Sequence, residues 1–328
     1  MSKVVDYSRL VRDSASLVPV LLETSHKGNS GRIGIFGGSV EFSGAPYFAG
    51  ISALKTGADL VYVFTASSAA PSIKSYSPEL MVLPFLDSDD AATRIRPWLK
   101  KLHSILLGPG LGRHDTIYSR VKDVIDTLKT TPTDTGKYRP LVFDADAIHF
   151  LTHHQNILKD YPGQVFLTPN TVEFDLLVNV ILGHEYEQPT EKLMKQLSKE
   201  IGKDVTIVLK GNIDLICDSK MQLVSDTKGS LRRCGGQGDI MSGILATFAA
   251  WAALREWADC SPSSSEVSDN ILAAYAASFL TRTCSRIAFA THSRSMLATD
   301  MIKEIPSVFK SYYDFQFHTH GEDFQNTI

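Results

Sequence analysis

Apolar residues occur along this chain in short continuous runs, and a stretch of helical periodicity follows most of them. Most of the runs end at or near Gly, Pro or Asp. The runs that we predict as strands are residues 33–36, 60–64, 104–107, 141–143, 165–167 and 206–209. Strands that are apolar throughout are typical of a parallel sheet with helices on both faces. The pattern therefore predicts an α/β fold with a mostly parallel central sheet.

The length and composition of the chain agree with one large domain. It has 328 residues, of which 43% are hydrophobic and 21% charged, and neither a repeat nor a long linker interrupts it. Polar stretches at residues 129–140 and 260–269 predict surface loops. The polar and aromatic stretch from about residue 312 predicts a poorly ordered tail. We expect a single domain over residues 1–328.

The net charge of the chain and its lack of recognisable targeting segments limit the classes of protein to which we expect it to belong. The formal net charge is −3 and the pI is about 6.4, so no basic field is available to bind nucleic acid or an anionic membrane. No stretch reaches the roughly 20 apolar residues needed to cross a bilayer. The N-terminal segment has amphipathic spacing and carries acids beside its arginines, which argues against secretion and against a mitochondrial presequence. We expect a cytoplasmic protein, with a mitochondrial location left open.

The cysteines of the chain predict no disulfide framework and no zinc site. They are Cys217, Cys234, Cys260 and Cys284. They form no C-x-x-C pair, and no His lies at the spacing of a zinc ligand. Reduced structural thiols are the expected reading.

A glycine-rich loop at residues 235–238 opens an apolar helix that we predict over residues 240–251, with Asp239 at its start. Glycines let backbone N–H groups approach a ligand closely, and a helix N-terminus adds partial positive charge. This combination suits a phosphoryl group in transfer, and Asp239 could take a proton from an attacking hydroxyl. The alternative is an ordinary aspartate at a helix N-cap after a flexible loop.

Two further polar motifs follow predicted strands. Lys210 lies after the run 206–209, where it can neutralise nucleotide phosphate; the alternative is a solvated lysine in an ordinary turn. Glu173 lies shortly after the run 165–167, where it can hold Mg²⁺ directly or through water; the alternative is an acid that complements the helix dipole. Ligands of such sheets bind beyond the carboxyl ends of the strands. The motifs therefore predict one shared site.

Other motifs match known sites poorly. Asp144-Ala145-Asp146 is similar to the strand-end motif of haloacid-dehalogenase-type phosphatases, but it lies far from the N-terminus and the residues that follow it differ. Residues 108–112 lack the spacing of a dinucleotide fingerprint, and Pro109 removes a backbone donor. Walker and nucleophile-elbow patterns are absent from the sequence.

In combination, the motifs resemble a known family. Asn170-x-x-Glu173 followed by Gly236-x-Gly238-Asp239 is similar to the paired signature of the ribokinase-like superfamily. Further segments narrow the resemblance to the nicotinamide-nucleotide-repair dehydratase family. They are residues 37–46, 53–60, 108–112, 144–147, 167–170 and 294–300. The resemblance covers about residues 22–306 and implies a ribokinase-like three-layer αβα sandwich.

The resemblance also implies an activity. Members of this family dehydrate the S epimer of the hydrated cofactors NADHX and NADPHX back to NADH and NADPH. Mg²⁺ would be the cofactor, and a nucleotide the co-substrate. Bacterial relatives typically have His at the position of Asn170 and use ADP, whereas eukaryotic relatives resemble this chain and use ATP. Phe42 replaces the Tyr of many relatives, so any substrate contact by that hydroxyl is missing here.

The roles of the family fall on matching positions of this chain. Asp239 would be the catalytic base and Glu173 the candidate metal ligand. The positions implied to contact the hydrated dinucleotide are Gly110, Asn170, Thr171, Val172, Glu173, Phe174, Asp175, Leu176 and Asp239. Those implied to hold ATP are Lys210, Gly211, Asn212, Ile213, Asp214, Gly229, Ser230, Leu231, Arg232, Arg233, Cys234, Gly235, Gly236, Gln237 and Gly238. An epimerase of the R and S hydrates is the implied functional partner, and many members form homo-oligomers.

The hypothesis for the mechanism is kinase chemistry with a different ending. Asp239 would take the proton of the C6 hydroxyl, which attacks the γ-phosphate, and the phosphate would then leave, pushed out by the ring nitrogen. An ordinary small-molecule kinase of the superfamily, acting on a vitamin or a sugar alcohol, is the alternative enzyme. A non-catalytic nucleotide-binding regulator is the alternative outside enzymes, and the intact Gly236-x-Gly238-Asp239 motif argues against it.

Overall fold

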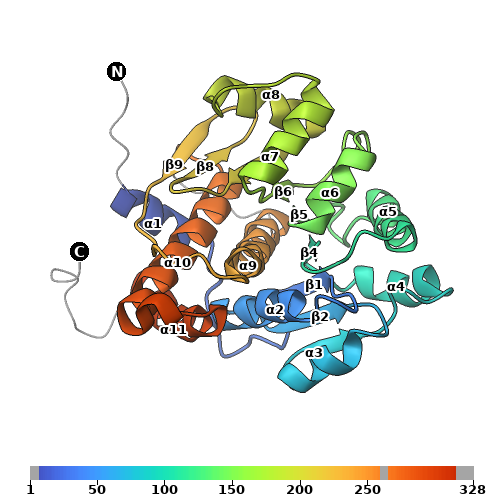
Figure 1. Ribbon diagram of the computed structural model, residues 1–328. Helices are drawn as coiled ribbons and strands as arrows, with labels where there is room; N and C mark the ends of the chain where they lie inside the picture. Colours follow the sequence, from blue (N-terminus) through green and yellow to red (C-terminus); the bar gives the residue numbers. More distant parts are fainter. Residues whose placement is uncertain (1–6, 259–264, 315–328) are drawn as a thin grey trace.

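The computed structural model describes residues 7–258 and 265–314. Within these residues, a nine-stranded sheet runs through the molecule in the order β3-β2-β1-β4-β5-β6-β7-β8-β9 (Figure 1). Strands β1 to β7 pair in parallel with their neighbours, and β8 and β9 pair antiparallel. The strands are β1 (Arg32–Phe36), β2 (Leu60–Phe64), β3 (Met81–Leu83), β4 (Ser104–Leu107), β5 (Leu141–Phe143), β6 (Val165–Leu167), β7 (Val205–Leu209), β8 (Asp214–Cys217) and β9 (Gln222–Ser225).

Every strand that the apolar runs predict is present. Only β1 and β7 differ, because each begins one residue earlier than its run. The strands that the sequence did not predict are β3, β8 and β9, which lie toward the two edges of the sheet. Only part of each of these short strands is buried. β8 and β9 each include polar residues, whereas β3 is a short apolar run that the sequence analysis did not count as a strand.

Helices cover both faces of the sheet (Figure 1). They are α1 (Tyr7–Ala15), α2 (Gly44–Thr56), α3 (Ala70–Tyr76), α4 (Ala91–Leu99), α5 (Asp115–Lys129), α6 (Asp146–His153), α7 (Thr171–Leu177), α8 (Glu191–Ile201), α9 (Gln237–Trp257), α10 (Asp269–His292) and α11 (Ala298–Tyr312), with short π and 3-10 turns at Val178–Leu182 and Ser293–Ser295.

Two hydrophobic cores separate these layers. One lies between the sheet and helices α1 to α3 and α9 to α11. The other lies between the opposite face and helices α4 to α8. Successive strand residues point to opposite faces, so Leu106 of β4 joins the first core while Ile105 and Leu107 join the second. The predicted three-layer αβα sandwich is confirmed.

Helix α9 is the buried centre of one helical layer. Nearly all of its residues from Ile240 to Ala253 are buried, because α2 and α10 pack on either side of it. A Cβ added at Gly243 would lie 2.1 Å from the carbonyl oxygen of Ala49 on α2. Glycine therefore lets the two helices approach closely. This packing fixes the first turn of α9, which carries Asp239, relative to the sheet.

The remaining sequence predictions concern the surface. The stretch 130–140 is irregular, as predicted. Most of the predicted loop at 260–269, including Cys260, and the predicted tail beyond residue 314 lie outside the described residues. Cys217, Cys234 and Cys284 are free thiols. Across residues 7–258 and 265–314, no helix combines the length and apolarity that a membrane crossing requires.

Candidate functional site

The polar motifs of the sequence meet at the carboxyl ends of four neighbouring strands, β4 to β7. Gly108 follows β4, Asp144 follows β5, Thr168 follows β6 and Lys210 follows β7. Adjacent parallel strands place these ends at one edge of the sheet. The backbone N–H of Lys210 donates to the carbonyl of Pro169 at 2.9 Å, which ties two of the ends together. The single shared site that the sequence predicts thus has a structural basis.

A buried ion pair lies at the floor of this edge. The Nζ of Lys210 is 2.8 Å from Oδ1 of Asp144, whose side chain is only 2% exposed. The hydroxyl of Thr168 donates to the same oxygen at 2.8 Å. Burial opposes the charge on both partners, but their mutual attraction prevails: the pKa of Asp144 is lowered and that of Lys210 is raised. Lys210 is therefore a charged, anchored lysine rather than a solvated one.

The turn that follows Asp144 is strained. Ala145 has φ 47° and ψ −117°, a conformation that residues with a Cβ rarely adopt. Such strain costs about 1–3 kcal/mol and persists only where the surrounding structure enforces it. Gly108 makes room for the turn, since a Cβ there would lie 1.7 Å from the carbonyl oxygen of Asp144. The strained turn aims Asp144 at Lys210 and leaves Asp146 to accept from the N–H of Gly112 at 3.0 Å.

Asp239 lies in the first turn of α9, partly buried behind the glycine loop. The N-cap of the helix is Gly236, whose φ of 94° favours glycine, and a Cβ there would lie 2.7 Å from that of Ala298. Burial and the charge of Asp144 raise the pKa of Asp239 to about 7, against the opposing effect of Lys210. A carboxylate with this pKa is suited to accept a proton near neutral pH.

Asn170 and Glu173 form a reciprocal cap at the start of α7. Oδ1 of Asn170 accepts from the N–H of Glu173 at 2.9 Å, and Oε2 of Glu173 accepts from the N–H of Asn170 at 2.8 Å. Burial raises the pKa of Glu173, with further contributions from Asp144 and Asp146, although Lys210 and the cap oppose this. Glu173 therefore has the structural role at the start of α7 that the sequence left open as an alternative. The excess negative charge around Glu173 would also favour a bound cation.

A cavity of about 470 Å³ opens beside these residues. Its predicted lining residues are Asn170, Thr171, Lys210, Gly211, Asn212, Asp214, Gly229, Ser230, Arg233, Gln237 and Gly238. Met241, Thr281, Arg282 and Ser285 also line it, and the sequence did not indicate them. The last three belong to α10, which is distant in sequence and brought here by packing against α9.

Arg282 organises the wall of this cavity. Its guanidinium makes a two-point ion pair with the buried carboxylate of Asp214, at 2.6 and 2.8 Å, and also donates to the carbonyl of Gly211 at 2.8 Å. Asp214 additionally accepts from the N–H of Gly211 and the hydroxyl of Ser278. Its carboxylate thus fixes the shape of the 211–214 turn. Gly211 and Asn212 of this turn line the cavity.

The loop 229–236 closes the other side of the cavity. Arg233 donates to the carbonyl of Ser230 at 2.9 Å and to Oδ1 of Asn212 at 3.3 Å, so it bridges the two walls. The amide of Gln237 donates to the carbonyl of Arg232 at 3.0 Å and contacts the sulfur of Cys234. The structure leaves Leu231, 90% exposed, and Ile213 on the surface. Gly235 and Gly236 form the approach to α9 rather than the wall of the cavity.

The positions predicted to contact the dinucleotide are spread over two loops and α7. Val172 is exposed, and Leu176 partly so. Phe174 is fully buried against Tyr186, whose hydroxyl donates to Asp175. Gly110 has φ 59°, and a Cβ there would lie 2.5 Å from the carbonyl oxygen of Phe42. The exposed Phe42 thus lies beside the 108–112 loop.

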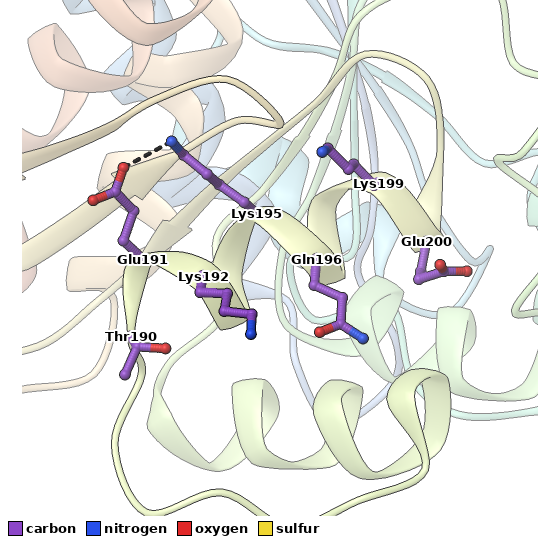
Figure 2. Close-up of a pocket in the computed structure, with 7 residues that line it drawn as sticks. All are labelled: Thr190, Glu191, Lys192, Lys195, Gln196, Lys199 and Glu200. Carbon is purple, nitrogen blue, oxygen red and sulfur yellow. Dashed lines mark ion pairs between the residues drawn. The ribbon is translucent and has the colours of Figure 1, made fainter.

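Three other hollows of the described chain contain none of the predicted site residues. Figure 2 shows one of about 670 Å³ along α8, lined by Thr190, Glu191, Lys192, Lys195, Gln196, Lys199 and Glu200. It is larger than the cavity at the strand ends, but its lining comes from a single helix and its N-cap. The ion pair between Glu191 and Lys195, 2.7 Å apart, is typical of a solvated helix face. We therefore place the site at the strand ends.

Known proteins match this chain over most of its length. The model of the family described as NAD(P)H-hydrate dehydratase matches residues 33–307. An ATP-dependent (S)-NAD(P)H-hydrate dehydratase of Aedes aegypti is 45% identical over 309 residues, which cover 94% of this chain and 86% of the relative.

Solved structures share the fold. A ribokinase-like superfamily protein of Enterococcus faecalis superposes with a TM-score of 0.74 at 23% identity, covering 92% of this chain and 94% of that one. An ADP/ATP-dependent NAD(P)H-hydrate dehydratase of Bacillus subtilis, co-crystallised with ATP and Mg²⁺, gives 0.66 at 21% identity, with 92% and 97% covered. At these identities the likeness shows the fold alone.

Proposed function

This chain belongs to the NAD(P)H-hydrate dehydratase family, and we propose that it dehydrates the S epimer of NADHX and NADPHX in a reaction that consumes ATP. The observation that carries the proposal is the position of Asp239. Its carboxylate, with a pKa of about 7, lies in the first turn of α9 beside the cavity that Lys210, Gly238 and Arg233 line. A base and a phosphate-binding wall are thus adjacent, as phosphoryl transfer requires.

The residues of this chain divide the work of the reaction. Asp239 accepts the proton of the C6 hydroxyl as its oxygen bonds to the γ-phosphorus of ATP and the bond to the β-phosphate breaks, which releases ADP. Backbone N–H groups at the start of α9 and the ammonium of Lys210 stabilise the charge of the phosphoryl group in transfer. The ring nitrogen then expels phosphate from C6, and loss of a C5 proton restores the double bond of NAD(P)H.

We propose Mg²⁺ as the cofactor, with Glu173 as the residue that holds it directly or through water. Within the described residues, no group of three or more His, Cys, Asp or Glu side chains forms a metal cage. Mg²⁺ is commonly bound by one or two carboxylates together with substrate phosphates. The raised pKa of Glu173 among neighbouring acids supports a cation here. The ion would neutralise charge on the phosphates of ATP.

The test is to add the protein to purified S-NADHX with Mg²⁺ and ATP and follow the near-ultraviolet absorbance of reduced nicotinamide. Parallel reactions contain ADP, no nucleotide, or the R epimer. We expect absorbance to rise only with the S epimer and ATP, with one ADP formed per NADH. A flat trace together with a stable phosphorylated product would replace the dehydratase by a kinase of the same superfamily.

The substrate, the sequence and the family also support proposals about the partner, the location and the assembly of the enzyme. Because one epimer is consumed, we propose functional pairing with an epimerase that interconverts the R and S hydrates. We also propose a cytoplasmic location and assembly into a homo-oligomer, as expected from the sequence and its family.

A further inference from the structure

The ammonium of Lys210 lies between the floor of the site and the catalytic helix. It is 2.8 Å from the carboxylate of Asp144, and a Cβ added at Gly238 would lie only 3.3 Å from it. Gly238 is the residue before Asp239. The side chain of Lys210 is only 21% exposed. This lysine is therefore held inside the site, close to the start of α9.

The position of Asp144 is enforced from several sides. Thr168 donates a hydrogen bond to the oxygen that also accepts from Lys210. The backbone N–H of Asp144 donates to the carbonyl of Leu107 at 3.0 Å. Gly108 leaves the space that the carbonyl of Asp144 occupies, and Ala145 keeps its strained conformation. A strained turn beside a close backbone contact indicates a site at which placement matters for function.

We propose that the Asp144–Lys210 ion pair is a positioning device for Asp239: it fixes an ammonium beside the first turn of α9 and balances the charge that the catalytic carboxylate experiences. The inference rests on the proposed function for the role of Asp239, and on the geometry for the pair itself. Asp144 is a positioning residue, because it acts on the reaction through Lys210 and Asp239. Lys210 has this role in addition to its contact with the phosphoryl group in transfer.

The balance follows from the charges that surround Asp239. Asp144 after β5 and Asp146 at the start of α6 both disfavour its charge, whereas Lys210 after β7 favours it. Glu173 on α7 interacts with Lys210 and Asp144. A lysine without Asp144 would hold Asp239 ionised and make it a weak base. An aspartate without Lys210 would keep Asp239 protonated at neutral pH. Because the charges of Asp144 and Lys210 offset each other, the pKa of Asp239 stays between these two extremes.

Variants that remove one charge test the pair, because Asp144 and Lys210 act on the pKa of Asp239 in opposite directions. We would prepare Asp144→Asn, Lys210→Met and the double variant, and measure kcat/KM for the hydrate against pH at saturating ATP. We expect the acidic limb of the profile to move to lower pH in Asp144→Asn and to higher pH in Lys210→Met, by about 1 unit or more. In the double variant the limb returns toward its original position.

A direct titration separates this inference from the proposed function. The carboxyl carbon of Asp239 can be followed by NMR in protein labelled at aspartate, with its signal assigned by its loss in Asp239→Asn. The titration of Asp239 could move in opposite directions in the two single variants while the original protein dehydrates no hydrate. That result would support the role of the ion pair and contradict the proposed reaction. Shifts of the same sign in both single variants, or none in folded protein, would overturn the inference.

Folding is controlled separately. Lys210→Met leaves Asp144 buried without its cation, so this variant can fail to fold. In that case the test rests on Asp144→Asn and the double variant. The acidic limb of the pH profile must then lie at a lower pH in Asp144→Asn than in the double variant. The matched control is Asp126→Asn, which removes a carboxylate that pairs with Lys122 on the surface of α5. It should leave the profile unchanged.

Discussion

Arg282 of α10 and Asp214 at the start of β8 are joined by a two-point ion pair, with N–O distances of 2.6 and 2.8 Å and side chains only 12% and 6% exposed. The pair connects the wall of the cavity at the strand ends to the helical layer behind it. Because Arg282 also donates to the carbonyls of Gly211 and Asn212, its guanidinium fixes the turn at which we propose that ATP binds.

Replacement of Arg282 by Met should therefore destabilise the protein and weaken ATP binding together. Asp214 would keep the N–H of Gly211 and the hydroxyl of Ser278 but lose its cation, and breaking a buried pair in this way costs about 3–5 kcal/mol. Thermal unfolding and the KM for ATP measure the two effects. Arg94→Met is the control, because its pair with Asp90 is exposed and 3.8 Å long and should contribute below about 1 kcal/mol. Equal stability of the two variants would contradict the role of Arg282.

Asp239→Asn should abolish most of the activity and leave nucleotide binding intact. The amide cannot accept the proton of the hydroxyl, and loss of a general base typically lowers the rate about 10²–10⁴-fold. Single-turnover measurements with S-NADHX give the chemical rate, and calorimetry with ATP gives the affinity. A variant that stays within about tenfold of the original rate would remove Asp239 from the role of base.

The pH dependence of activity should report the ionisation of Asp239. Only the ionised carboxylate can accept a proton, and its pKa is raised to about 7 by burial and by Asp144. We expect kcat/KM to fall about tenfold per pH unit below that value. A limb near the ordinary aspartate pKa of about 4 would mean that another group limits the reaction.

The same carboxyl should lower stability as the pH rises. Its pKa is higher in the folded chain than in the unfolded one, so the fold favours the protonated form. The penalty for ionisation is absent below about pH 4, grows between about 4 and 7, and is complete above that range. We therefore expect Asp239→Asn to unfold at a higher temperature than the original protein at about pH 8, with the difference shrinking toward about pH 4. A constant difference across this range would contradict the linkage.

Ala145→Gly should preserve or raise stability, although glycine usually destabilises folded elements. Glycine adopts φ 47°, ψ −117° without the strain of a Cβ, which offsets the larger entropy of its unfolded state. The matched variant is Ala147→Gly, since Ala147 is fully buried in α6 and should lose stability by about 1 kcal/mol or more. Chemical denaturation of both variants provides the comparison. A larger loss at Ala145 than at Ala147 would show that the turn is not strained.

The sequence indicated most of the fold and the location of the site. Strands β1, β2 and β4 to β7 are buried on both faces, so their apolar runs are visible without any tertiary information. The polar motifs follow those runs directly, and parallel pairing is enough to gather them at one edge. The motifs in their order also indicated the family, which the match over residues 33–307 confirms.

What only the tertiary structure decided is how the charged groups pair. Lys210 and Asp144 are 66 positions apart, and their contact depends on β5, β6 and β7 being neighbours in the sheet. Arg282 reaches the site because α10 packs against α9, and nothing in its local pattern distinguishes it from a surface arginine. Periodicity records which face of an element is buried, whereas the partner of a charge is set by distances between elements. The raised pKa of Asp239 depends on those distances, because it arises from burial and from the neighbouring Asp144.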